Sequence, residues 1–229
     1  MLKNYRLTLT KKRSGFTLAE VLVTLAIIGV VTALTIPALI HNTKNQQILS
    51  GVKKAYSEFS QAYTSFIAED VDMDTLWAGT SQSAAILNQF ATKLNVVKNC
   101  GTGTGCFPDV TYITLNGAAW TNINQNTGRS KAILADGTTV YIYDNPGPVG
   151  CTTDNGDGAL NNTCGNFVVD INGFKGPNQM GRDAFPFFIT KSGVLPYGSN
   201  NDAYVGSCTI SGAGQGCSAQ ILLEGAVNY

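Results

Sequence analysis

The sequence predicts an α+β protein in which one long N-terminal helix packs on a small antiparallel β-sheet whose loops are fastened by disulfides. Two patterns predict the helix: an apolar run from Phe16 to Ile40, and a stripe of apolar residues at three- and four-residue steps that follows it to about Ala68. Beyond the helix, short β-prone segments alternate with turn residues, and all 6 cysteines lie in this later part.

The apolar run is long enough to cross a membrane. As a helix it measures about 37 Å, and the hydrocarbon core of a bilayer is about 30 Å thick. The segment before Gly15 contains no acidic residue and five basic ones: Lys3, Arg6, Lys11, Lys12 and Arg13. A positively charged segment beside a membrane span stays on the cytoplasmic side. We therefore expect a single span at residues 16–40 and an exported domain at 41–229. A cleaved secretory signal would have a shorter apolar region, followed by a cleavage site of small residues. This run is longer, and no such site follows it.

Glu20 is the only charged residue between Phe16 and Ile40. A charged side chain in the middle of a bilayer costs at least ~2.5–3.5 kcal/mol. A plain membrane anchor would not need it. We therefore expect Glu20 to have a specific function.

The stretch KKRSGFTLAEVLVTLAIIGVV, from Lys11 to Val31, resembles the N-terminus of type IV pilins and of the pseudopilins of type II secretion. The resemblance implies a leader at residues 1–15, which a membrane prepilin peptidase removes by cutting after Gly15. It implies N-methylation of the new first residue, Phe16. In the family's filaments, the glutamate at the place of Glu20 neutralises the N-terminal amine of a neighbouring subunit. Pro37 also matches the family and should kink the helix.

The resemblance implies a pilin-like fold and a structural function. The chain would be a subunit of a type II secretion pseudopilus or of a type IV pilus, polymerised through its N-terminal helix. Its partners would be the prepilin peptidase, other pilin or pseudopilin subunits and an inner-membrane assembly platform. It would lie first in the inner membrane and then in a periplasmic or cell-surface filament.

A second hypothesis is a minor pilin that carries a ligand-binding or adhesive module at the filament tip. An enzyme is not expected, because the sequence contains no hydrolase elbow, zinc-protease motif or phosphate loop. Nucleic acid is not an expected partner either. After Gly15 the chain carries ten basic and fifteen acidic residues, whereas phosphate binding requires clustered positive charge.

The body is expected to begin with the amphipathic half of the long helix, residues 41–68, and to continue through an α/β part, residues 69–229. A short helix is predicted at residues 83–94 by its apolar face. Asp136-Gly137 between two β-prone runs predicts a hairpin over residues 131–144. Further strands are expected at residues 112–115, 166–171 and 183–190, with a turn at 191–193.

The number of cysteines is even, and no pair has the C-x-x-C spacing of a zinc knuckle. Disulfides are expected if the body is exported, whereas free buried thiols would require a reducing compartment. Six cysteines allow 15 connectivities. We favour pairing between near neighbours: Cys100–Cys106, Cys151–Cys164 and Cys208–Cys217.

The segment DINGFKGPNQMGRD, from Asp170 to Asp183, is rich in oxygen-bearing side chains and glycines. This composition suits Ca²⁺, with Asp170, Asn172 and Asp183 as ligands. The resembled family adds weight, because major pseudopilins bind calcium in a C-terminal loop. The favoured alternative is a set of Asx turns that fixes the loop without a metal. Asp154 and Asp157 form a weaker second candidate, and no other cofactor is expected.

Overall fold

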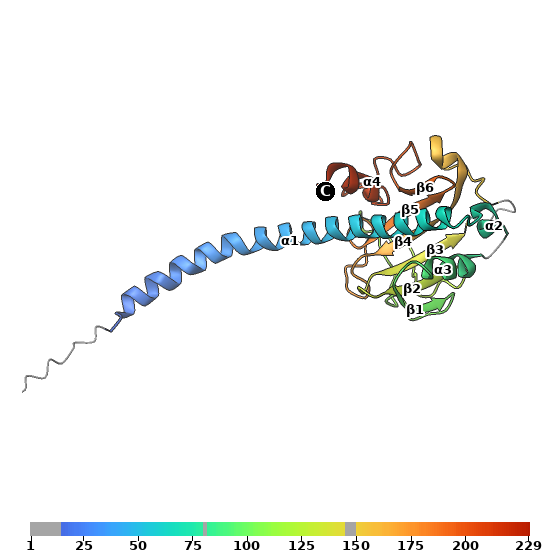
Figure 1. Ribbon diagram of the computed structural model, residues 1–229. Helices are drawn as coiled ribbons and strands as arrows, with labels where there is room; N and C mark the ends of the chain where they lie inside the picture. The colour runs from blue at the N-terminus through green and yellow to red at the C-terminus, as the bar shows by residue number, and fades with distance from the viewer. Residues whose placement is uncertain (1–14, 80–81, 145–149) are drawn as a thin grey trace, which may run out of the picture. The chain divides into compact units, whose positions relative to one another are not determined.

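The computed structural model describes residues 15–79, 82–144 and 150–229 (Figure 1). Most of the expected leader, including its five basic residues, lies outside the described residues. The chain divides into two compact units, residues 1–44 and 45–229.

Helix α1 is the longest element and spans Leu18–Ala68. The prediction of one helix up to Ala68 is confirmed, although the helix begins two residues after Phe16. Pro37 lies inside α1, where it cannot donate the backbone hydrogen bond of an ordinary helical residue. In the second unit, α1 buries one apolar stripe, as its period predicts: Val52, Ala55, Phe59, Ala62, Tyr63 and Phe66.

The second unit contains a six-stranded antiparallel sheet in which each strand pairs with the next along the chain. Its strands are β1 (Val96–Gly101), β2 (Ser130–Leu134), β3 (Thr139–Asp144), β4 (Thr163–Asp170), β5 (Ala184–Thr190) and β6 (Gly193–Pro196). The α+β prediction is thereby confirmed. So are the hairpin at β2–β3 and the strands at β4 and β5.

The expected strand at residues 112–115 is wrong. These residues form only isolated bridges, from Ile113 to Ala119 and Gln179. Their backbone N–H groups donate to several segments and not to one neighbouring strand: those of Tyr112 and Thr114 stay in the same loop, whereas those of Ile113 and Leu115 reach Asn178 and Ala213. Strand β1, which was not predicted, forms one edge of the sheet. Its residues show no alternation of apolar and polar side chains that would predict a strand.

The helix predicted at residues 83–94 is confirmed as α3 (Ser83–Ala91), which ends three residues earlier, and two short helices were not predicted. These are α2 (Met73–Trp77) and α4 (Cys217–Glu224). A local cap accounts for α2, because the Asp72 carboxylate accepts the Asp74 N–H at 3.0 Å. Both helices are too short to show a clear apolar period.

The main core lies between the sheet and the helices (Figure 1). The Phe59 ring of α1 stacks on Phe167 of β4, with ring centroids 3.9 Å apart. Phe90 of α3 packs against Phe66 of α1 in a T-shaped arrangement, with ring centroids 5.0 Å apart. These contacts fix the second half of α1 to the sheet, as the amphipathic pattern predicts.

Three disulfides join Cys100 to Cys106, Cys151 to Cys164 and Cys208 to Cys217. They are the near-neighbour pairs favoured from the sequence. All six cysteines belong to the described part of the chain, and none of them is free. Each disulfide closes a short loop, so the three act locally on the body.

Candidate functional site: the segment around Gly15, Phe16 and Glu20

The residues that flank the expected cleavage bond precede the helix. Gly15, Phe16 and Thr17 are non-helical, and α1 begins at Leu18. Phe16 is 90% exposed, and a side chain at Gly15 would meet no atom within 4 Å. The Gly15–Phe16 peptide bond is therefore accessible, and no helical hydrogen bond has to break before an enzyme reaches it.

Thr17 and Glu20 close the N-terminus of α1 through reciprocal hydrogen bonds. Glu20 Oε2 accepts from both the backbone N–H and the hydroxyl of Thr17, each at 2.8 Å. The Thr17 hydroxyl in turn accepts the Glu20 N–H at 3.2 Å. This arrangement is a capping box, and it satisfies donors that a helix start otherwise leaves unpaired.

The capping box turns the Glu20 side chain back toward the residues near the expected cut. A carboxylate there is also favoured by the positive end of the helix dipole. Among the described residues no hydrogen bond reaches the second oxygen, Oε1. Glu20 thus has one oxygen held by Thr17 and one open to a partner. Glu20 was predicted from the sequence to have a specific function but Thr17 was not, although the T-x-x-E spacing is a recognisable capping signal.

The apolar part of α1 is left uncovered by the rest of the described residues. Every side chain described between Phe16 and Ile40 is exposed, and α1 is long and apolar enough to cross a membrane. Thr24 and Thr35 donate their hydroxyl hydrogens to helix carbonyls at 2.9 and 2.8 Å, so these polar groups are satisfied in an apolar medium. Such a surface requires lipid or other helices around it.

The candidate calcium residues do come together. Asp170 Oδ1 accepts the N–H groups of Asn172 and Gly173 at 3.0 and 2.8 Å, and Oδ2 accepts the Tyr112 hydroxyl at 2.5 Å. Asp183 Oδ1 accepts from Asn172 Nδ2 at 2.9 Å. Its other oxygen accepts two backbone N–H groups, those of Asn178 and Gln179.

These donors occupy both carboxylates and fix the turns of the loop, which favours the Asx-turn interpretation. The described residues contain no group of three or more His, Cys, Asp or Glu side chains arranged to hold a metal. Asp154 and Asp157 are likewise engaged, since Asp154 accepts the Gly156 N–H and Asp157 accepts from Asn201. The calcium hypothesis stays a prediction.

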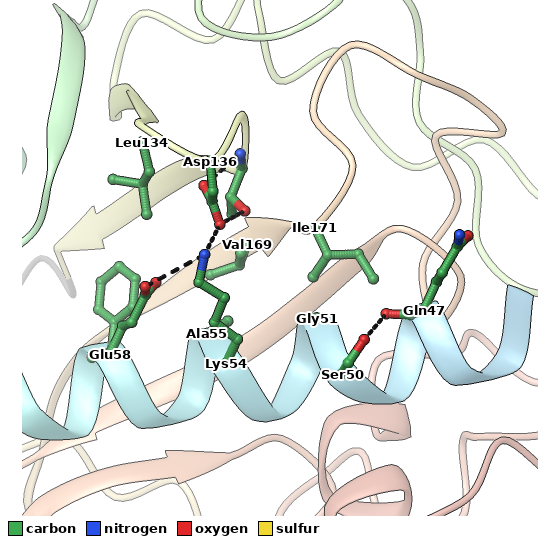
Figure 2. A pocket seen from close by; sticks show the side chains of 12 residues that line it. Gln47, Ser50, Gly51, Lys54, Ala55, Glu58, Leu134, Asp136, Val169 and Ile171 are labelled. Atoms are coloured by element: carbon green, nitrogen blue, oxygen red, sulfur yellow. Dashed lines mark hydrogen bonds and ion pairs between the residues drawn. The ribbon is translucent and has the colours of Figure 1, made fainter. Parts of the chain in front are cut away.

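A cavity of about 270 Å³ lies between α1 and the β2–β3 hairpin (Figure 2). Lys54 reaches across it to pair with Asp136, and its Nζ also lies 3.7 Å from Glu58 Oε1. Asp136 accepts the Thr138 N–H and hydroxyl as well. Lys54 thus stands between two carboxylates, and its ion pair with Asp136 attaches the hairpin to the helix. The positions of these three side chains are not typical of a catalytic nucleophile or of a general base.

Comparison with known proteins gives one result. Residues 10–36 match the prokaryotic N-terminal methylation motif. The match includes the expected cleavage bond, the exposed Phe16 and the capping box. No curated protein and no solved structure matches the chain.

Proposed function

We propose, from the methylation motif that the chain shares with type IV pilins and pseudopilins, that it is a filament subunit made as a prepilin. It is inserted in the inner membrane with a cytoplasmic N-terminus, cut after Gly15 and methylated on Phe16. It is then polymerised through α1 into a secretion pseudopilus or a type IV pilus. The match at residues 10–36 is the observation that carries this proposal.

The local geometry supports processing at this bond. Gly15 has no side chain, and Gly15 and Phe16 precede the helix in exposed backbone. A peptidase that admits only a small residue before the cut could bind this segment without unwinding α1. The capping box sets the start of the helix after Phe16 and so keeps the bond outside it.

Assembly would supply a partner for Oε1 of Glu20, which accepts no hydrogen bond from the described residues. The cut creates a positive amine on Phe16, and a buried charge is tolerated when it is paired and hydrogen-bonded. Thr17 holds Oε2 of Glu20, so Oε1 can receive the amine of a neighbouring subunit. The same packing would cover the exposed apolar face of α1 with other helices.

A structural subunit agrees better with the motif than an enzyme does. At the cavity beside α1, Lys54 is paired with Asp136 and Glu58, and the acids of the β4–β5 loop accept hydrogen bonds from their own loop and from Tyr112. Both arrangements stabilise the body. The body would then serve as the exported part that neighbouring subunits or secreted partners meet.

N-terminal mass spectrometry of protein from sheared filaments tests the proposal. We expect a chain that begins at Phe16 and carries one N-methyl group. Gly15→Ala should slow cutting only modestly, and Gly15→Leu should block it by bulk. Assembled protein that still begins at Met1 would refute the proposal.

A further inference from the structure

The cavity between α1 and the β2–β3 hairpin has an apolar floor and a charged mouth (Figure 2). The floor consists of the buried side chains of Ala55, Phe59, Leu134 and Val169. The mouth consists of Lys54, Glu58 and Asp136, whose side chains are 48%, 38% and 29% exposed. All of these residues belong to the second unit. A ligand in this cavity would therefore meet hydrocarbon inside and charge at the entrance.

Gly51 of α1 brings a further apolar side chain to the cavity. A Cβ at this position would lie only 2.9 Å from Cδ1 of Ile171, which is closer than two such carbon atoms approach. Because the glycine has no side chain, Ile171 packs directly on the helix. Ile171 also lines the cavity (Figure 2), so the glycine extends the apolar surface inside it.

The mouth carries a net negative charge of one, because it contains two carboxylates and one ammonium group. Lys54 donates to Asp136, which also accepts from the Thr138 hydroxyl. Glu58 is held less closely, since its Oε1 lies 3.7 Å from Nζ of Lys54, beyond the length of a hydrogen bond. Glu58 can therefore accept from a second cation while Lys54 stays paired with Asp136.

We propose that this cavity binds a small organic cation, in which one ammonium group is attached to a compact apolar group. The apolar group occupies the floor, and the ammonium group donates to Glu58 at the mouth. The volume of about 270 Å³ is slightly below the ~300–1,000 Å³ of sites for drug-sized ligands, so a smaller molecule suits it. An organic anion is disfavoured, because Lys54 already lies between two carboxylates.

A lysine side chain of another protein is a second source of an ammonium group. It carries the charge at the end that enters first, which would place an unpaired charge on the apolar floor at a high cost. A free molecule can enter with its apolar end and leave its charge at the mouth. The geometry therefore favours the free molecule. The site lies in the second unit and does not depend on the proposed function.

The probe for the test is benzylammonium, compared with benzyl alcohol and benzoate, which are similar in size but neutral and negative. Calorimetric titration of the full-length protein in detergent micelles measures binding, and titration of protein-free micelles corrects for partitioning. We expect saturable binding of benzylammonium at millimolar concentration or below, and affinities at least about tenfold weaker for the other two. An absence of saturable binding, or equal binding of benzyl alcohol, would overturn the proposal.

A variant of Glu58 locates the binding site. Glu58→Gln keeps the size of the side chain and removes its charge, so it should weaken the binding of benzylammonium at least about tenfold. Asp70→Asn is the matched control, because it removes an exposed acid outside the cavity, and the φ of 55° at this position suits asparagine. It should bind as the wild type does. Wild-type affinity in Glu58→Gln would refute the assignment of the site.

Lys54→Met gives an independent arm. It removes the competing ammonium group and leaves two carboxylates, so benzylammonium should bind at least about threefold more tightly. Unchanged or weaker binding would overturn the proposal even if Glu58→Gln fails to fold.

The amide of Nα-acetyl-lysine tests the other source of the ammonium group. It should bind the wild type at least about tenfold more weakly than benzylammonium does. Equal binding would assign the cavity to a lysine side chain of a partner and would overturn the free ligand.

Discussion

Thr17 and Glu20 hold each other at the start of α1, with the Glu20 carboxylate accepting two hydrogen bonds from Thr17 and the Thr17 hydroxyl accepting the Glu20 N–H. The pair therefore has two consequences. It fixes where the helix begins, and it orients the one charged group of the apolar segment. A carboxylate with three free rotatable bonds would lose more entropy on binding a partner than one that is already held.

This relationship predicts that Thr17 assists assembly. Thr17→Val keeps the size of the side chain but removes its hydroxyl, which should weaken the helix start by about 0.5–2 kcal/mol. We expect a partial loss of filament incorporation, measured as the ratio of sheared-filament to membrane-bound protein. Thr17→Ser keeps the hydroxyl and is the matched control. Equal incorporation of the valine and serine variants would show that the capping box has no role in assembly.

Lys131 is predicted to be essential for the stability of the body. Its side chain is fully buried, and Nζ donates to the backbone carbonyls of Thr102, Asn124 and Asn126 at 3.3, 3.1 and 2.5 Å. Lys131→Met keeps the length but leaves these acceptors unpaired, at about 1–3 kcal/mol each. We expect a loss of about 3 kcal/mol or more in the free energy of unfolding by denaturant. The control is Lys53→Met on the exposed side of α1, which should stay within about 0.5 kcal/mol of wild type.

The disulfides are predicted to be complete in protein isolated without reductant. Peptide mapping without reductant should find the three near-neighbour pairs and no free thiol. The Cys151–Cys164 pair lies in the main core, and both of its side chains are buried. Losing it should cost about 2–4 kcal/mol. A peptide that joins Cys106 to Cys208 would contradict the pairing.

Calcium is predicted to have little effect on the β4–β5 loop, because hydrogen bonds from the loop and from Tyr112 already occupy Asp170 and Asp183. The melting temperature of the full-length protein should be the same in millimolar Ca²⁺ and in chelator. A higher melting temperature in Ca²⁺ would instead support the calcium hypothesis, through the linkage of binding to stability. In that case Asp183→Asn should abolish the increase, and Asp70→Asn should leave it unchanged.

The parts of the fold that the sequence predicted are those with a strong period or a specific turn. The apolar stripe that includes Phe59 and Phe66 repeats over many turns of α1, so its buried face could be assigned. Asp136-Gly137 fixed the β2–β3 hairpin because few dipeptides suit that turn. These features depend on neighbours in the chain.

The parts that were missed depend on distant contacts. The residues around Ile113 are β-prone, yet their backbone hydrogen bonds go to several segments, Asn178 and Ala213 among them, and not to one partner strand. Strand β1, with exposed Val97 and Lys98, belongs to the sheet only because β2 pairs with it. At the candidate site, the sequence identified Gly15, Phe16 and Glu20. The hydrogen bonds that Thr17 makes to Glu20 became evident only in the structure.

Filament incorporation of Glu20→Ala tests the central claim most directly. The change removes a charge from the apolar segment and makes insertion cheaper by ~2.5 kcal/mol or more, so a failure of insertion cannot explain a loss of assembly. Glu20→Gln keeps the shape without the charge, and Glu20→Asp keeps the charge on a shorter arm. The measurement is the ratio of sheared-filament to membrane-bound protein, with cleavage after Gly15 verified in each variant. The account predicts normal cleavage with strongly reduced incorporation for alanine and glutamine and a partial defect for aspartate; wild-type incorporation of the alanine variant would contradict it.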